Sequence, residues 1–244
     1  MKSLFLFIGL LLSFNNLTAQ KKVTENTTSK GIKDVYVNLK FANNIIIKNW
    51  NKNEISVEAT VNLDDNEHND YFSLKADKIG ETYKVTSDYG DYFKKYRSYY
   101  TSDCDDEDDK KKNINYKESH SNIVNYVIYV PENMQLKVKS ISGDVEAETY
   151  VGILKLDLIS GNITVKKHSK DMHLKTISGD IDIYVSDAKL EAKTLTGGVY
   201  SDLDIDFDKN KKHGFGSKIV TTISKGTAFL RLDTISGDIY LRKI

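Results

Sequence analysis

The stretch from Tyr89 to Tyr100 contains the residue types that most often form a binding surface. Five tyrosines occur there together with a phenylalanine and an arginine, outside any strand-like alternation. Tyrosine and arginine are enriched where proteins contact other surfaces, and aromatic faces also stack on sugar rings. The alternative is a solvated hairpin without a binding role. The candidate binding residues are Tyr89, Tyr92, Tyr96, Arg97, Tyr99 and Tyr100.

An acidic run follows the tyrosines, and its carboxylates could supply the hard oxygen ligands that Ca²⁺ prefers outside the cell. The run lacks the alternate-residue spacing and the turn glycine of an ordered calcium loop. Lys110–Lys112 could instead neutralise it as part of a solvated loop. No other cofactor is expected. The candidate metal ligands are Asp103, Asp105, Asp106 and Asp108.

Three further groups of residues could carry chemistry, but each has a structural alternative. His168, Asp171 and His173, at the junction between two coils, could bind a metal, although histidines in a polar turn are usually solvated. Cys104 lies among carboxylates, which disfavour the reactive thiolate. Asp144, Asp180 and Asp238 could act in the groove of a polysaccharide-cleaving enzyme. They recur with a repeat, however, and a catalytic pair need not recur.

That repeat is a motif of the type Ser-Gly-Asp-Ile, which occurs five times. Its first four glycines are 18 residues apart and the fifth follows after 40, and a fixed period indicates stacked repeats. Glycine suits a sharp corner, and the neighbouring polar side chains can hydrogen-bond the bend. In the regular array aspartate alternates with other residues, so no two of these carboxylates are expected on adjacent coils. The corner residues are Gly143, Asp144, Gly161, Asn162, Gly179, Asp180, Gly197, Gly237 and Asp238.

Apolar residues recur seven, five and two positions before each glycine and two positions after it, and most residues between them are charged or small. This period-two alternation predicts a strand on each side of every corner. We therefore predict an all-β, single-stranded parallel β-solenoid with about 18 residues per coil. The general bias of parallel crossovers favours right-handed coils. The column two positions before the glycine, expected in the core, contains Ile141, Ile159, Ile177, Leu195 and Ile235.

The chain divides into four expected parts. Residues 1–19 have the charge and the short apolar run of a signal peptide, and residues 20–34 would form an N-terminal linker. The solenoid would span residues 35–244, with a flexible insertion at about 87–121 that is too polar to bury a core. The mature chain would be exported to the periplasm, the outer membrane or the cell surface, without a transmembrane segment. With 35 basic and 35 acidic residues it offers no overall charge to attract nucleic acid.

Three segments resemble a known family: NNIIIKNWNKNEISVEATV, YVIYVPENMQLKVKSISGDVEAE and LRLDTISGDIYLRKI. They are similar to the bacterial "putative adhesin" domain of unknown function, also called the toastrack domain, over roughly residues 35–244. The resemblance implies a β-solenoid at or near the cell surface without established chemistry, and it transfers no catalytic residue.

The sequence therefore predicts a non-enzymatic module for adhesion, interaction or scaffolding in the cell envelope. Its expected partners are envelope proteins or surface glycans. Two alternatives remain: a carbohydrate-active β-helix enzyme, and a subunit that associates end to end through its terminal coils.

Overall fold

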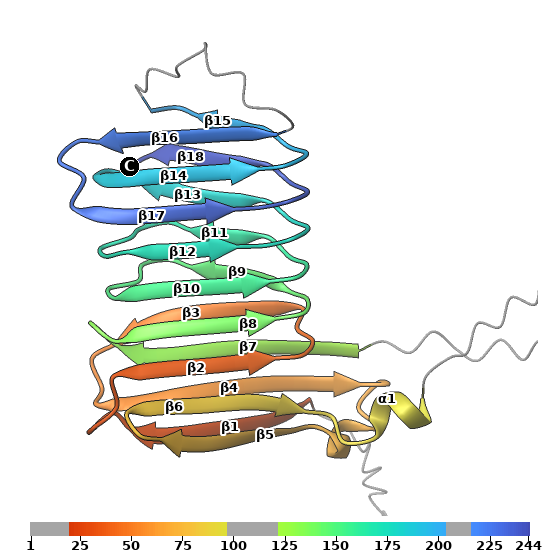
Figure 1. Ribbon diagram of the computed structural model, residues 1–244. Helices are drawn as coiled ribbons and strands as arrows, with labels where there is room; N and C mark the ends of the chain where they lie inside the picture. Colours follow the sequence, from red (N-terminus) through yellow and green to blue (C-terminus); the bar gives the residue numbers. More distant parts are fainter. Residues whose placement is uncertain (1–19, 97–121, 204–215) are drawn as a thin grey trace, which may run out of the picture.

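The computed structural model describes residues 20–96, 122–203 and 216–244. These residues form two nine-stranded sheets, called sheet A and sheet B, around one continuous apolar core. Figure 1 shows the strands stacked one above another, with the N-terminal part of the chain at one end of the stack. The all-β prediction is confirmed, because the described helical segments are only the 3-10 turn η1 (Asn69–Tyr71) and the short helix α1 (Tyr92–Lys95). No described helix is long and apolar enough to cross a membrane.

Neighbouring strands in each sheet often come from distant parts of the chain. In spatial order, sheet A contains β1 (Lys21–Thr28), β4 (Glu54–Leu63), β7 (Asn122–Pro131), β3 (Asn44–Trp50), β9 (Asp144–Ala147), β11 (Ile163–Val165), β13 (Ile181–Val185), β18 (Ile239–Lys243) and β15 (Val199–Ser201). In the same way, sheet B contains β16 (Ser217–Ile223), β14 (Ala188–Thr194), β17 (Ala228–Asp233), β12 (Met172–Lys175), β10 (Ile153–Leu158), β8 (Gln135–Ser140), β2 (Asp34–Leu39), β6 (Thr82–Asp88) and β5 (Ser73–Ile79).

Each Ser-Gly-Asp repeat forms one coil, with a strand in sheet B before the corner and a strand in sheet A after it. In the regular array, residues 18 positions apart pair in register, as Leu136 with Leu154 and Leu154 with Met172. Parallel pairing with constant register brings the same column of each coil to the same face. The repeat therefore builds both sheets with one pattern.

Three of the four predicted apolar columns form the core. The columns seven and five positions before the glycine are at most 2% exposed, as Leu154 and Leu174 show. The column two positions after it is buried in four coils, including Ile163 and Ile181, and only partly buried at Val199 in the terminal coil. Burial of such side chains contributes roughly 1.5–3 kcal/mol each.

The prediction that the column two positions before the glycine is buried is wrong. These residues are 39–51% exposed, and Phe41 continues the column at 38%. Side chains alternate between the two faces of a strand, and the residue five positions before the glycine is buried. The residue three positions before it is therefore also inside, as Ser140 and Thr176 show, and the residue two positions before it faces outward. The resulting exposed column, called the aliphatic ridge, consists of Ile141, Ile159, Ile177, Ile235 and Leu195 in stacking order, and Phe41 lies next to Ile141 at its end.

The corner glycines are required because successive coils approach closely. Gly179 has φ of +150°, and a Cβ there would lie 2.2 Å from the carbonyl oxygen of Gly161. The hydroxyl of Thr176 donates to that same carbonyl at 3.0 Å. A side chain at the corner would therefore clash with backbone that already accepts a hydrogen bond.

The residue after the glycine bonds the next coil, and not its own bend as the sequence suggested. Oδ1 of Asp144 accepts the N–H of Asn162 at 2.8 Å, and Oδ1 of Asn162 accepts the N–H of Asp180 at 2.9 Å. Oδ1 of Asp180 accepts from Asp238 at 2.7 Å, and Oδ1 of Asp238 accepts from Gly198 at 2.8 Å. Gly198 lies in the terminal coil of sheet A, and among the described residues no further coil stacks on it.

The stacking order of the coils differs from their order in the chain. The last coil, β17 and β18, is inserted between the coil of β12 and β13 and the coil of β14 and β15 (Figure 1). The prediction that no two corner aspartates lie on adjacent coils is therefore wrong, because Asp238 stacks on Asp180. The hydrogen bond between them offsets the repulsion of the two carboxylates.

The prediction of a purely parallel, single-stranded solenoid holds only for the repeat region. At the N-terminal end, β1, β4 and β7 pair antiparallel in sheet A, and β5 pairs antiparallel with β6 in sheet B. At the other end β16 is antiparallel to β14. Antiparallel strands need only short turns, so they can begin and end a stack of parallel coils.

Two predicted boundaries also change. Residues 20–34 were expected to be a linker, but β1 pairs with β4 along its whole length, from Lys21 with Val61 to Thr28 with Glu54. The insertion was expected to begin at residue 87, but Ser87 and Asp88 belong to β6 and residues up to 96 are part of the folded domain.

Candidate binding surface on sheet B

A row of basic side chains crosses the outer face of sheet B. Lys137, Lys155, His173 and Arg231 occupy directly paired positions on β8, β10, β12 and β17. Adjacent strands lie about 4.8 Å apart, where the unit charges of the paired Lys137 and Lys155 repel by about 0.9 kcal/mol even in water. We call these four residues the basic row. The core does not depend on these four side chains, because they point outward and the residues before and after them on each strand are the ones that are buried.

The next row toward the corner has alternating charge. In spatial order Lys139, Asp157, Lys175, Asp233 and Lys193 pair along the sheet. Asp157 lies 3.5 Å from the Nζ of Lys139 and 3.9 Å from that of Lys175. In chain order Lys175 and Lys193 would have been neighbours, and the inserted coil places Asp233 between them. Charges of opposite sign therefore alternate along this second row, whereas the basic row has no acidic member.

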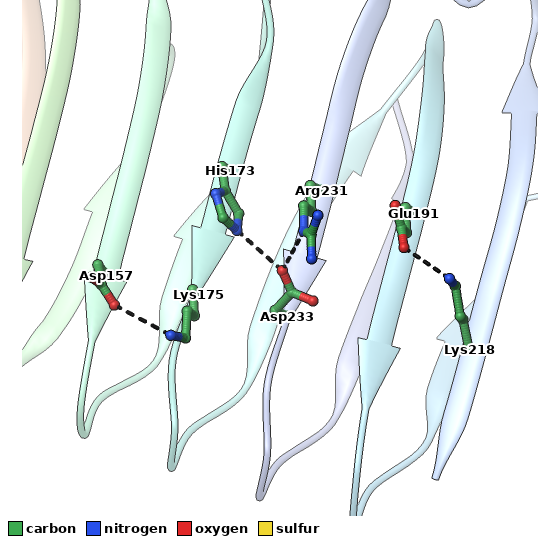
Figure 2. Close-up of polar contacts among 7 residues, drawn as sticks. All are labelled: Asp157, His173, Lys175, Glu191, Lys218, Arg231 and Asp233. Atoms are coloured by element: carbon green, nitrogen blue, oxygen red, sulfur yellow. Dashed lines mark hydrogen bonds and ion pairs between the residues drawn. The ribbon is translucent and has the colours of Figure 1, made fainter. Parts of the chain in front are cut away.

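Asp233 joins the two rows (Figure 2). Its Oδ2 accepts a hydrogen bond from Nε of Arg231 at 2.8 Å and lies 3.1 Å from Nε2 of His173. Burial raises the pKa of Asp233, but Arg231 and His173 together outweigh it and hold that pKa below its ordinary value. Asp233 therefore stays ionised and fixes the direction of both basic side chains. This contact uses only Nε of Arg231, and the terminal nitrogens of the guanidinium make no hydrogen bond within the described residues.

Two open pockets lie on either side of the basic row, and His173 and Arg231 line both. The first has a volume of about 390 Å³ and is walled by Lys175 and Lys193 and by Leu195 and Ile235 of the aliphatic ridge. The second has a volume of about 270 Å³, and its wall includes Lys155, Ile153, Asp171 and Phe229. Phe229 is 44% exposed. Each pocket thus combines cations with an apolar wall, a combination that binds an anionic group attached to an apolar surface.

The predicted binding residues that the structure describes are not on this surface. Tyr89 and Tyr92 are 2% and 1% exposed, and Tyr96 packs against the core. The Tyr89 hydroxyl donates to the carbonyl of Phe41 at 3.0 Å, and burial raises the pKa of Tyr89 and of Tyr92. The expectation that these rings lie outside the core is therefore wrong.

The Tyr92 hydroxyl lies 2.8 Å from Oδ2 of Asp64 and 2.6 Å from Oδ1 of Asn122, so it connects α1 to the start of β7. Tyr89 and Tyr92 therefore belong to the buried core. Arg97, Tyr99 and Tyr100, together with Asp103, Asp105, Asp106 and Asp108, lie outside the described residues.

The other candidates for chemistry have structural positions. The corner aspartates bond the next coil, as described above. His168 is buried at 8% exposure, whereas His173 is on the outer face. Within the described ranges no cluster of three or more His, Cys, Asp or Glu side chains could hold a metal ion.

The residues of the basic row were visible in the sequence as a charged column but were not recognised as a site. The column six positions before the glycine contains Lys137, Lys155, His173, Glu191 and Arg231. In chain order Glu191 interrupts the basic residues. Only the inserted coil makes Arg231 the neighbour of His173 and moves Glu191 to the end of the row, beside Lys218 (Figure 2).

Comparison with solved structures finds the same fold in a protein described as a "putative cell adhesion protein" from Clostridium sporogenes. The two chains are 12% identical, the alignment covers 92% of this chain and 100% of the other, and the TM-score is 0.56. A "putative lipid binding protein" from Parabacteroides distasonis is 10% identical over 91% of this chain and 96% of its own, but its TM-score of 0.22 is too low to indicate a shared fold.

No curated protein matches the chain. Residues 131–242 match the family described as Toastrack DUF4097. The match contains all five corner glycines and both strands of every repeat coil except the last residue of β18. The resemblance found in the sequence is thus confirmed over residues 131–242, which match the Toastrack DUF4097 family.

Proposed function

We propose that the protein is an exported, non-catalytic module of the cell envelope that binds an anionic partner through the outer face of sheet B. The observation that carries this proposal is the basic row between two pockets. Like charges in directly opposed positions destabilise a sheet. Their presence next to a row that alternates in sign marks the basic row as a surface for negative charge from outside the chain.

Three further observations support a binding module. The fold is shared with a protein described as a "putative cell adhesion protein", which favours a role in attachment. The first 19 residues have the sequence features of a signal peptide, which supports export. The corner carboxylates, the best candidates for a polysaccharide-cleaving enzyme, already accept backbone hydrogen bonds from the next coil.

The test compares retention of purified protein on isolated bacterial envelopes. A variant with Lys137→Gln, Lys155→Gln and Arg231→Gln should lose at least tenfold in retention at low salt. The matched control removes three exposed lysines elsewhere, with Lys22→Gln, Lys30→Gln and Lys48→Gln, and should bind as the wild type does. Equal loss in both variants would show that only net charge matters and would contradict the proposal.

The enzyme alternative is tested in the same samples by release of reducing sugar from a panel of polysaccharides. No release is expected from the wild type. Release that disappears in Asp180→Asn would favour the enzyme, because that variant keeps an oxygen acceptor for the N–H of Asp238, as Asn162 does for Asp180.

A further inference from the structure

The strands beneath the basic row determine how a ligand can be recognised. β10, β12 and β17 each have a hydrogen-bonded strand on both sides, so their backbone groups are used within sheet B. A peptide cannot add to this face as a further strand, because that mode needs a free sheet edge. The ligand must therefore be recognised by side chains alone.

The direction of the ligand follows from the register. One basic residue comes from each of four adjacent coils, so the row runs across the strands and along the stack. Successive members of the row are about 4.8 Å apart. A linear chain with regularly spaced negative groups could contact several of them at once, which raises its apparent affinity without any new type of contact.

The pocket walls indicate what lies between those negative groups. Phe229 and Ile153 line one side of the basic row, and Ile235 and Leu195 line the other. The backbone N–H of Phe229 donates to Oδ1 of Asp171 at 2.8 Å, which fixes the start of β17 beside the second pocket. An exposed aromatic ring held in place offers a flat apolar face, and sugar rings stack on such faces through their C–H groups.

The cations indicate the charged group. Arg231 has its Nε occupied by Asp233, and its planar guanidinium can still present terminal N–H groups to a carboxylate. Lys155 is exposed and makes no ion pair with the described residues, so it is available as a second positive charge. Both residues line the pocket that contains Phe229.

From these observations, and resting on the proposed function of this face, we infer that the ligand is an acidic polysaccharide. Its chain crosses β10, β12 and β17 obliquely, from the pocket that contains Phe229 to the pocket beside Leu195. Its carboxylates contact Lys155 and Arg231, and a sugar ring stacks on Phe229. Sugar units on the two sides of Arg231 occupy the two pockets. His173 and Arg231 line both pockets, so the pockets are neighbours and can hold successive sugar units.

The test measures binding of the full chain to immobilised polygalacturonate and to its methyl-esterified form, which has the same sugar chain without the charge. Wild type should bind polygalacturonate at least tenfold more tightly, and raising the salt concentration should weaken this binding. Arg231→Gln and Lys155→Gln should each lose several-fold in affinity and flatten the salt dependence.

Phe229→Ala separates sugar recognition from simple charge attraction. It should lower the affinity several-fold and leave the salt dependence unchanged, since it removes an apolar contact. Ile79→Ala, at an exposed apolar residue on β5, is the matched control and should bind as the wild type does. Thermal unfolding of each variant checks that the fold is intact.

Several results would overturn the inference while the proposed function stands. Equal binding of both polygalacturonate forms would exclude carboxylate recognition. Dextran sulfate binding as tightly, with no effect of Phe229→Ala, would show general polyanion attraction. Stronger competition by a peptide of residues 103–109 with Cys104→Ser would indicate an acidic protein segment as partner. If envelope retention does not depend on the basic row, the proposed function itself fails.

Discussion

Gly143, Gly161, Gly179 and Gly237 combine a positive φ with close contact to the neighbouring coil, and the two effects can be separated. Gly179→Ala introduces a Cβ 2.2 Å from a backbone oxygen that cannot move away. We expect this variant to lose more than about 3 kcal/mol of unfolding free energy, because steric strain adds to the backbone cost.

The control is Gly80→Ala, where φ is +61° but no atom lies within 4 Å of the new Cβ. Only the backbone cost of about 1–2 kcal/mol applies there. Urea denaturation followed by circular dichroism gives both values. Equal losses would mean that close stacking at the corner does not contribute.

His168 predicts a dependence of stability on pH. Its ring is 8% exposed, and neither ring nitrogen has a hydrogen-bond partner among the described residues. Burial lowers the pKa of His168, although the charge of Asp187 acts in the opposite direction. The unfolded chain has a histidine pKa near 6.5 and so binds the proton more readily than the folded chain does. Stability is therefore complete above that value and falls as the pH decreases, by up to about 1.4 kcal/mol per pH unit.

The measurement compares urea midpoints of wild type and His168→Phe between pH 7 and pH 5. The variant keeps an aromatic ring in the core but has no group to protonate, so its stability should fall less steeply over this interval. Identical slopes would mean that His168 does not take part in the loss.

At the scale of the strand, the alternation of side chains decides which isoleucines support the fold. Ile181 is fully buried in β13, whereas Ile177 in the aliphatic ridge is 39% exposed although both come from the same repeat. Ile181→Asp buries an unpaired charge and should unfold the protein. Ile177→Asp should cost less than about 1 kcal/mol, because its side chain remains in contact with water. Thermal melting of the two variants shows which isoleucine faces the core. A large decrease in the melting temperature of Ile177→Asp would place Ile177 in the core.

On the outer face of sheet B, the second row alternates between lysine and aspartate from strand to strand. Lys139 and Lys175 pair with the aspartate between them, and Asp233 separates Lys175 from Lys193. Without β17, Lys175 and Lys193 would face each other on β12 and β14. The inserted strand thus improves electrostatics in the second row at the same time as it extends the basic row.

For the whole molecule, the insertion means that β17 and β18 lie inside the stack and not at its end. Removal of residues 227–244 deletes β17 and β18 and separates β12 and β13 from β14 and β15. Hydrogen exchange should then show loss of protection throughout residues 172–201, and cooperative unfolding should disappear.

Deletion of residues 20–28 is the control, because β1 pairs only with β4 at the edge of sheet A. This deletion should leave protection of β12 to β15 unchanged. Retained protection of residues 172–201 after the C-terminal deletion would contradict the stacking order.

Several features of the protein follow from the sequence by itself. The corners, the strands beside them and three core columns depend on local properties: the conformational freedom of glycine and the two-residue period of a strand. These properties repeat every 18 residues, so five copies identify them clearly. The all-β class and the family resemblance follow from the same repeats, whereas the handedness of the coils stays a prediction.

Tertiary structure decided the stacking order and, with it, the candidate site. Strand pairing in a stack depends on matching faces and charges, and the cost of a longer connection grows only slowly with its length, so a coil 40 residues away can pair as well as the next one. Tyr89 and Tyr92 are buried for a related reason, because they pack against Phe72 and Tyr71 of another segment, contacts that local composition does not reveal. Arg231 becomes the neighbour of His173 only after the last coil inserts, since this contact joins residues 58 positions apart that no local pattern connects.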